Sequence, residues 1–299
     1  MGNAITRRGR GVEKKIRNLR ADLMLRLFSG RRRRRLLLEA MPPEVLLMTL
    51  KFDDHVVTVH PREAIGRRVF AEGHYDRDRV EAVLTILDAE GLIPEAGMTV
   101  IEIGANIGTQ ALYFSLSGRV ARILAIEPDP RNLALLRRNI EENGLASRVS
   151  VVECAIGSAD SEGLLYRTAG NHGASSLFPR EGAADSVHVA IRPLSTILAE
   201  NAIAQDTVDF IWMDIEGAEP QACASIEGLL RRQVPMMMEF SPSIYGPEAA
   251  EAFIRLLGRY YRRCLRFDGE GVTPVRIADL PRNGRLVDLL LLPDTTAEV

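Results

Sequence analysis

From residue 98 onward, short apolar runs alternate with segments whose apolar residues recur every three or four positions. The runs predict strands and the periodic segments predict helices. Such alternation is typical of an α/β fold with a mostly parallel sheet covered by helices on both faces. The predicted strands are 98–103, 122–127, 149–154, 208–214, 234–240, 262–267 and 286–292, and the predicted helices between them are 108–117, 130–143, 218–231 and 247–258.

Three other regions have their own patterns. Residues 44–60 alternate and are rich in β-branched types, which predicts a hairpin, and residues 77–90 predict a helix with one apolar face. The segment 158–195 is too long for a plain connection and predicts an inserted β-hairpin beside a polar loop at 171–176. The expected organisation is a basic arm (1–40), a hairpin and helix that pack on the core (41–96), a core domain (97–293) and a tail (294–299).

Charge separates the N-terminal arm from the body. Residues 1–35 hold thirteen Lys or Arg against Glu13 and Asp22, a balance of +11, so the overall charge of −2 leaves −13 on the remainder. Apolar residues recur at helical spacing over 12–27. We expect a peripheral contact of residues 7–35 with anionic membrane, or a solvated or docking tail; nucleic acid is the weakest alternative because the body is acidic.

Three widely spaced cysteines suggest neither a disulfide framework nor a zinc knuckle. No apolar stretch reaches the roughly 18 residues of a membrane span, and no export signal is evident. We therefore expect a cytoplasmic protein, with the inner membrane face as the site of any peripheral contact. The sequence does not indicate an oligomeric state.

The segment from Val100 to Thr109 carries the most specific motif, an E-x-G-x-N-x-G turn between a strand and a helix. Glycines permit turn geometries that other residues cannot adopt. A carboxylate at this turn repels phosphates and suits a cofactor with hydroxyls and a cation, so S-adenosylmethionine is favoured over NAD. The turn residues expected to bind it are Glu102, Gly104, Ala105, Asn106 and Gly108.

Two later strand ends complete the expected cofactor site. Glu127, followed by Pro128, is placed to accept hydrogen bonds from a ribose diol; the alternative is an acidic residue that stabilises a helix N-terminus. Cys154 and Ala155 end the third strand with small side chains that leave space for an adenine edge. Cys154 is not expected to be a nucleophile.

Three carboxylates follow the fourth strand within six residues: Asp214, Glu216 and Glu219. Their repulsion raises the proton affinity of at least one of them, so the group suits general-base assistance to methyl transfer onto a hydroxyl. Asp214 would hold the amino-acid end of the cofactor or orient the acceptor, and Glu216 would be the base. Glu219 is expected on the acceptor side, with a helix cap as the alternative.

Two further residues are candidates for the same crevice. Glu239 closes an apolar strand, and His172 is a weaker acid/base candidate because histidine titrates near neutrality. Asp214, Glu216, Glu239 and His172 are also conceivable cation ligands. The chain has no dedicated metal-ligand spacing, so no metal is expected.

Taken together, residues 66–293 resemble the FkbM family of S-adenosylmethionine-dependent methyltransferases. The resemblance rests on residues 72–76, 97–108, 127–128, 154–157 and 175–176, and above all on Asp214-Ile215-Glu216-Gly217-Ala218-Glu219. It implies a class I Rossmann-like sheet of seven strands with the last antiparallel, and it adds Tyr75, Ser175 and Ser176 on the acceptor side.

The resemblance also implies O-methylation of a sugar, glycan or secondary-metabolite hydroxyl. The chain departs from the family at Trp212, where a lysine is usual, at Thr109-Gln110, where aromatic residues are usual, and after Thr196, where the usual acidic residue is absent. These departures leave open a rival interpretation, a non-catalytic methyltransferase-like protein in a membrane or glycan-assembly complex. A nucleobase methyltransferase is disfavoured because Asp-Ile-Glu-Gly replaces that class's Asn/Asp-Pro-Pro-aromatic motif.

Overall fold

The structure is a computed structural model, and it describes residues 30–179, 183–268 and 271–294. The helix expected at 12–27 and nearly all of the tail lie outside the described residues. Within the described ranges, no helix combines the length and apolar character that crossing a bilayer requires. The boundaries proposed for the four segments stay a prediction.

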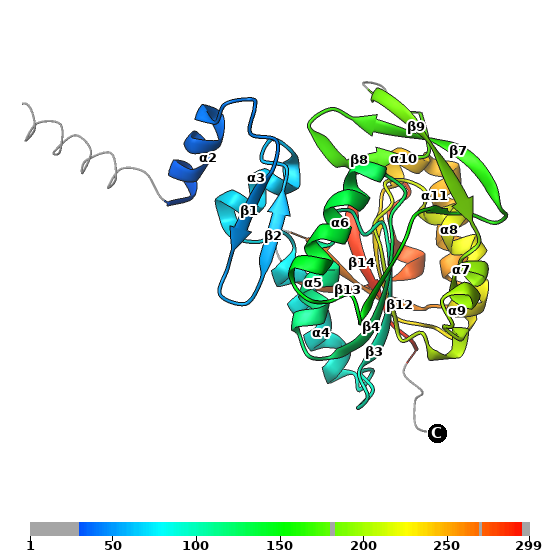
Figure 1. Cartoon of the computed structure of the whole chain (residues 1–299). Helices are drawn as coiled ribbons and strands as arrows, with labels where there is room; N and C mark the ends of the chain where they lie inside the picture. The colour runs from blue at the N-terminus through cyan, green and yellow to red at the C-terminus, as the bar shows by residue number, and fades with distance from the viewer. Residues whose placement is uncertain (1–29, 180–182, 269–270, 295–299) are drawn as a thin grey trace, which may run out of the picture.

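The core of the molecule is a sheet of eight strands in the order β13-β12-β14-β11-β10-β3-β4-β5. Figure 1 shows helices on both sides of this sheet. The five strands from β11 to β5 run parallel, whereas β14 is antiparallel to both β11 and β12. The predicted fold class and the antiparallel last strand are confirmed. The strands are β3 (Met98–Ile103), β4 (Val120–Ile126), β5 (Val149–Val152), β10 (Phe210–Met213), β11 (Met236–Phe240), β12 (Arg263–Asp268), β13 (Gly271–Arg276) and β14 (Val287–Leu291).

The eighth strand, β13, is the difference from the expected seven. It pairs with β12 at the edge of the sheet, and most of its side chains are exposed. It therefore lacks the apolar alternation by which strands are found in a sequence. Pro274, which has no N–H to donate, is tolerated because the strand has a neighbour on one side only.

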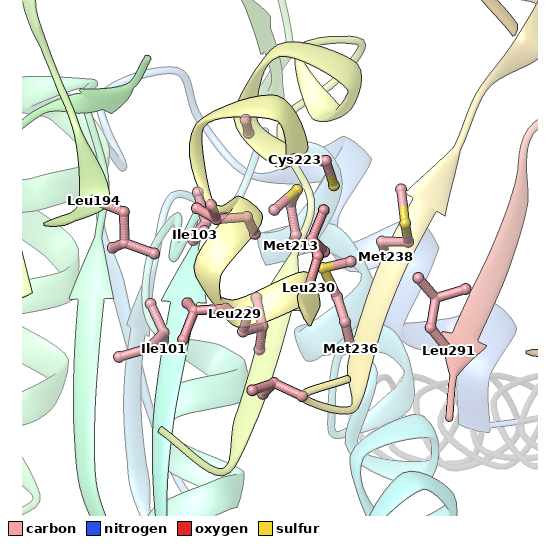
Figure 2. Close-up of a cluster of buried hydrophobic side chains, with 14 of the residues drawn as sticks. Ile101, Ile103, Leu194, Met213, Cys223, Leu229, Leu230, Met236, Met238 and Leu291 are labelled. Atoms are coloured by element: carbon pink, nitrogen blue, oxygen red, sulfur yellow. The ribbon is translucent and has the colours of Figure 1, made fainter. Parts of the chain in front are cut away.

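Successive side chains of the parallel strands point to opposite faces of the sheet, and both faces are buried. Ile101 and Ile103 of β3 pack on the face covered by α8 and α9, together with methionines of β10 and β11 (Figure 2). Val100 packs on the other face, against α4 and α5. The three cysteines are buried and free, as the sequence suggested.

The helices largely follow the predicted segments. The one expected at 218–231 is interrupted at Ile226, which separates α8 from α9, and α2, α3, α7 and α10 were not anticipated. The helices are α2 (Gly30–Ala40), α3 (Ala64–Glu72), α4 (Arg77–Ala89), α5 (Thr109–Leu116), α6 (Pro130–Glu142), α7 (Leu194–Glu200), α8 (Glu219–Ser225), α9 (Glu227–Arg231), α10 (Pro242–Tyr245) and α11 (Pro247–Leu257), with 3-10 turns at Gln205–Thr207 and Ile277–Asp279.

The predicted N-terminal hairpin is present as β1 (Met48–Lys51) and β2 (Val56–Val59). Asn139 of α6 and Asn143, which caps the C-terminus of that helix, hold it on the core by pairing with the backbone of β2. Asn139 accepts from the Thr58 N–H at 2.7 Å and donates to the Thr58 carbonyl at 3.1 Å, and Asn143 does the same for Val56 at 2.9 and 2.6 Å. This docking brings the following helix, α3, to the carboxyl edge of the large sheet.

The insertion after β5 forms a second sheet in the order β6-β9-β7-β8. The predicted hairpin is confirmed, because Leu164 of β7 lies opposite His188 of β9. The prediction of a polar loop at 171–176 is wrong: these residues form β8, which pairs with β7 although its side chains lack apolar alternation. The strands are β6 (Ala155–Ile156), β7 (Ser161–Thr168), β8 (Asn171–Ser176) and β9 (Ala183–Arg192).

Candidate active site

A cavity lies at the carboxyl edge of the large sheet, bounded by α3 on one side and by the inserted sheet on the other. Parallel strands end at the same edge, so residues that follow different strands meet there. The residues predicted from the sequence that line it are Tyr75, Gly104, Asn106, Glu127, Pro128, Cys154, Ala155, His172, Ser175, Asp214, Glu216 and Glu239. Five other predicted residues are close in sequence but buried elsewhere: Glu102, Ala105, Gly108, Ser176 and Glu219.

The glycine turn has the backbone geometry that the motif predicted. Gly104 and Gly108 have φ values of 87° and 83°, and Asn106 between them has 51°. The N–H groups of Gly104 and Ala105 both donate to the Ile126 carbonyl of β4, at 2.9 and 3.0 Å. A Cβ atom on Gly104 would lie 1.9 Å from the Asp214 carbonyl oxygen. The glycine is therefore required for the approach of the loop after β10, which carries the candidate base.

Glu102 does not line the cavity as the sequence predicted. Its side chain is fully buried, and both carboxylate oxygens have no hydrogen-bond partner within the described structure. Burial raises the pKa of Glu102 to about 8, and the charge of Glu127 adds to the effect. The reason for the difference is register: Glu102 pairs with Trp212 and Ala125, and both of these pack on the face of the sheet that α4 and α5 cover.

Glu127, directly after β4, has its carboxylate at the cavity and is held in place by three donors. The N–H of Asn106 donates to one oxygen at 2.8 Å; the N–H of Asp129 and the side-chain amide of Asn132 donate to the other at 2.8 and 3.3 Å. Burial nevertheless raises the pKa of Glu127 to about 7. Asn132 was missed by the sequence analysis, although its position in the first turn of the following helix places it near the acidic residue.

A buried ion pair joins the inserted sheet to this edge. Asp129, the N-cap of α6, receives two hydrogen bonds from Arg167 of β7 at 2.6 and 3.0 Å and two from Arg131, one from its N–H at 2.9 Å and one from its guanidinium at 3.1 Å. Burial acts to raise the pKa of Asp129, but the hydrogen bonds from the two arginines outweigh it and lower the pKa. The pair keeps the wall formed by β7 and β8 next to Glu127.

His172, on β8, makes its contacts on the Glu127 side of the cavity. Its Nε2 lies 3.1 Å from Glu63 at the start of α3, whose other oxygen accepts from the His172 N–H at 2.7 Å. The carbonyl of His172 accepts from Asn132 at 3.4 Å. Burial lowers the pKa of His172, although the charge of Glu63 opposes this. These contacts assign His172 to closing the cavity wall and leave its predicted acid/base role without support.

Three carboxylates that line the cavity lie close together. One oxygen each of Asp214, Glu216 and Glu239 lies within 4.8 Å of the others. Burial and then the charges of Glu216 and Glu219 raise the pKa of Asp214 well above its usual range, and burial with the charge of Asp214 raises that of Glu239 to about 10. Such a cluster has a high affinity for a proton or for a cation. A divalent ion with oxygen ligands at 2.3–2.6 Å is compatible with this spacing, although the sequence indicated no metal site.

The loop that carries Glu216 is strained and held from two sides. Glu216 itself has a φ of 54°, a conformation that non-glycine residues adopt at a cost. The hydroxyl of Ser176 donates to the Glu216 carbonyl at 2.9 Å. The buried carboxylate of Glu219 accepts from the N–H groups of Ile215 and Gly217 at 3.1 and 3.0 Å. Ser176 and Glu219 therefore position the loop rather than line the cavity, which corrects their predicted placement; Glu219 begins α8, but its carboxylate binds the loop before the helix and makes no cap hydrogen bond.

The chemistry of the cavity matches one class of ligand. Four of its lining residues are acidic and, among the lining residues of the described chain, none is lysine or arginine. The side-chain carbonyl oxygens of Asn106 and Asn132 at the cavity have no hydrogen-bond partner in the described structure. Acceptor atoms without a partner suit a ligand that brings hydroxyl and amino groups and positive charge, and they disfavour a dinucleotide phosphate.

Comparison with known proteins agrees with this site. The profile described as the methyltransferase FkbM domain matches residues 102–264, which is more than half of the chain. The chain belongs to the FkbM methyltransferase family. The match covers the glycine turn, Glu127 and the carboxylates after β10, and it begins after the N-terminal hairpin.

Individual relatives of this FkbM family member are distant. The methyltransferase sdnD of Sordaria araneosa is 27% identical in an alignment of 155 residues that covers 43% of this chain and 60% of that protein. The chain therefore spans less than two thirds of the length of this relative. An FkbM methyltransferase from Methylobacillus flagellatus KT has a TM-score of 0.42 and 18% identity, over 66% of this chain and 44% of the other; a Bacillus cereus O-methyltransferase in complex with SAH has 0.36 and 15%, over 77% and 97%.

The main departure from the family pattern, Trp212, has a structural explanation. Its side chain is 3% exposed and packs against Phe114 of α5, with ring centroids 5.7 Å apart at an interplanar angle of 76°. The indole thus fills space in the core on the α4 and α5 face. Trp212 does not line the cavity, so its presence alone gives no reason to regard this family member as inactive.

Proposed function

We propose that this protein transfers a methyl group from S-adenosylmethionine to a hydroxyl oxygen of a sugar, glycan or secondary-metabolite acceptor. The observation that carries the proposal is the meeting of Asp214, Glu216 and Glu239 within 4.8 Å in the cavity that the glycine turn and Glu127 also line. A cofactor half and a proton-accepting half therefore lie next to each other.

The cofactor half consists of the turn at Gly104–Gly108, Glu127 with Pro128, and the small residues Cys154 and Ala155. When bound, S-adenosylmethionine supplies a methyl group that is already activated by the sulfonium. Glu127 would accept hydrogen bonds from the ribose, and the unpartnered oxygens of Asn106 and Asn132 would accept from further donors. The acidic lining would favour the positive charge of this cofactor.

The acceptor half contains the carboxylates, with Tyr75 and Ser175 on the same lining. Burial and mutual repulsion raise the pKa of Asp214 above its usual range and that of Glu239 to about 10, so the cluster holds a proton more tightly than isolated carboxylates do. Glu216, on the strained loop, would take the proton of the acceptor hydroxyl as its oxygen attacks the methyl group. A site with high proton affinity is suited to this step, because an alcohol gives up its proton reluctantly.

The test has two stages. Calorimetry first measures whether the protein binds S-adenosylhomocysteine. The absence of saturable heat would refute the proposal at that point. A screen of hydroxylated acceptors with a labelled methyl donor then compares the wild type with Glu216→Gln, which keeps the side-chain shape but removes the base. We expect retained binding of S-adenosylhomocysteine and a loss of transfer of about 100-fold or more.

The matched control is Glu248→Gln, the same chemical change at an exposed position at the start of α11. It should leave transfer unchanged. Because the carboxylates act here on a proton, EDTA should also leave transfer unchanged; a loss restored by Mg²⁺ or Ca²⁺ would instead assign the three oxygens to a cation. Unchanged turnover by Glu216→Gln on an identified acceptor would refute the base role while leaving cofactor binding intact.

A further inference from the structure

Helix α2 is fixed to the molecule by one of its faces. Leu38 is buried, Arg31 and Arg35 lie 3.7 and 3.5 Å from Glu72 of α3, and Arg34 donates to the Phe70 carbonyl at 3.5 Å. At about 100° per residue these positions share one side of the helix. Figure 1 shows α2 at one end of the molecule, with α3, β1 and β2 between it and the large sheet.

The opposite face of α2 carries Arg33, Leu36 and Leu37, and it is exposed. Leu36 and Leu37 are 51% and 60% accessible, although leucine is among the residues most often buried. Six residues after α2 ends, Leu46 and Leu47 are exposed as well. Half of the large apolar side chains that are exposed in the described chain thus lie within residues 36–47. Such a concentration of exposed leucines in one short segment is typical of an interaction surface.

The distribution of charge along the chain indicates the charge of the partner that this surface binds. Residues 1–35 hold a balance of +11, and the other residues hold −13. A negatively charged partner would attract α2, which holds five arginines against Glu39, and repel the acidic body. Arginine side chains with leucines one turn away are the composition of helices that lie in a membrane interface, where the cations meet phosphates and the leucines enter the acyl boundary.

We propose that the outward face of α2 (Arg33, Leu36 and Leu37), with Leu46 and Leu47, docks on an anionic phospholipid bilayer. This inference is independent of the methyl-transfer proposal, because no residue of the cavity takes part in it. Nucleic acid is the less suitable partner, because its phosphates bind cations but provide no apolar environment for exposed leucines.

The experiment is co-sedimentation of the full chain with vesicles of phosphatidylcholine, with and without phosphatidylglycerol. The wild type should sediment with the anionic vesicles and stay in solution with the neutral ones. Leu36→Ser combined with Leu37→Ser should weaken partitioning at least about tenfold at both low and high salt, because buried apolar area is lost. Arg33→Gln should weaken it about fivefold at low salt and less at high salt.

Two controls repeat these changes elsewhere on the surface. Val272→Ser with Leu286→Ser removes two apolar side chains that are each 42% exposed, and Arg255→Gln removes a cation from α11. Both should partition like the wild type, and circular dichroism should show that every variant is folded. The proposal is overturned if the wild type does not sediment with anionic vesicles, or if the α2 variants sediment with them to the same extent as the wild type. It is also overturned if the Leu36/Leu37 variant loses binding to duplex DNA but not to vesicles.

Discussion

The contact between Gly104 and Asp214 offers the sharpest test of how the site is assembled. In Gly104→Ala the new Cβ would start 1.9 Å from the Asp214 carbonyl oxygen. The loop would have to retreat by about 1.1 Å to reach even 3.0 Å, a separation below which real Cβ contacts essentially do not occur. The atom in the way belongs to the backbone, so no side-chain rotation can relieve the overlap.

A second cost comes from the backbone of the glycine itself. Its φ of 87° would cost alanine about 1–2 kcal/mol. Gly118→Ala isolates this term, because Gly118 has a φ of 71° and no atom within 4 Å of its Cβ position. The difference between the two variants therefore measures the displaced loop alone, at about 1–3 kcal/mol for an overpacked contact.

Calorimetry with S-adenosylhomocysteine and thermal unfolding would measure both consequences. For Gly104→Ala we expect the dissociation constant to rise at least about 100-fold, since misplacement by about 1 Å is costly in a preorganised site. We also expect its melting temperature to fall by several degrees below that of Gly118→Ala. Gly118→Ala should bind like the wild type. Equal affinity and equal melting temperature in the two variants would refute the argument that this glycine permits the loop after β10 to close on the turn.

Two further outcomes follow from burial. Glu127→Gln should weaken the binding of S-adenosylhomocysteine about 10- to 100-fold. Because burial raises the pKa of Glu127 to about 7, the affinity of the wild type should increase from about pH 6 to about pH 8 as the accepting carboxylate forms. The variant should not show this pH dependence. A pH-independent wild type would contradict this role. Trp212→Lys should lower the free energy of unfolding by about 3 kcal/mol or more, because the family's usual lysine would here be a buried unpaired charge. Denaturation by urea would measure it, with Trp212→Phe as a milder control, and an unchanged midpoint for the lysine variant would place the side chain outside the core.

Local signals were sufficient for most of the fold and for the backbone of the glycine turn. The parallel strands are apolar on both faces, so their positions could be predicted from composition alone, and the glycine turn has the positive φ values that its motif requires. The strands that local signals missed lie at the edge of a sheet or consist of polar residues. Strand β13 has exposed side chains, and β8 is made of small polar residues that pair with β7 through backbone groups common to every sequence.

Placement of the individual carboxylates depended on the tertiary structure. In the sequence, Glu102, Glu216 and Glu219 are all acidic residues within two positions of a glycine, yet register buries Glu102 in the sheet and hydrogen bonds turn Glu219 back onto its own loop. Glu239 joins Asp214 and Glu216 only because β11 lies beside β10. The sequence by itself determined which strand ends carry acids, because local pattern sets strands and turns. Which of those acids face one another was decided by strand register and by contacts between distant segments, which no local pattern records.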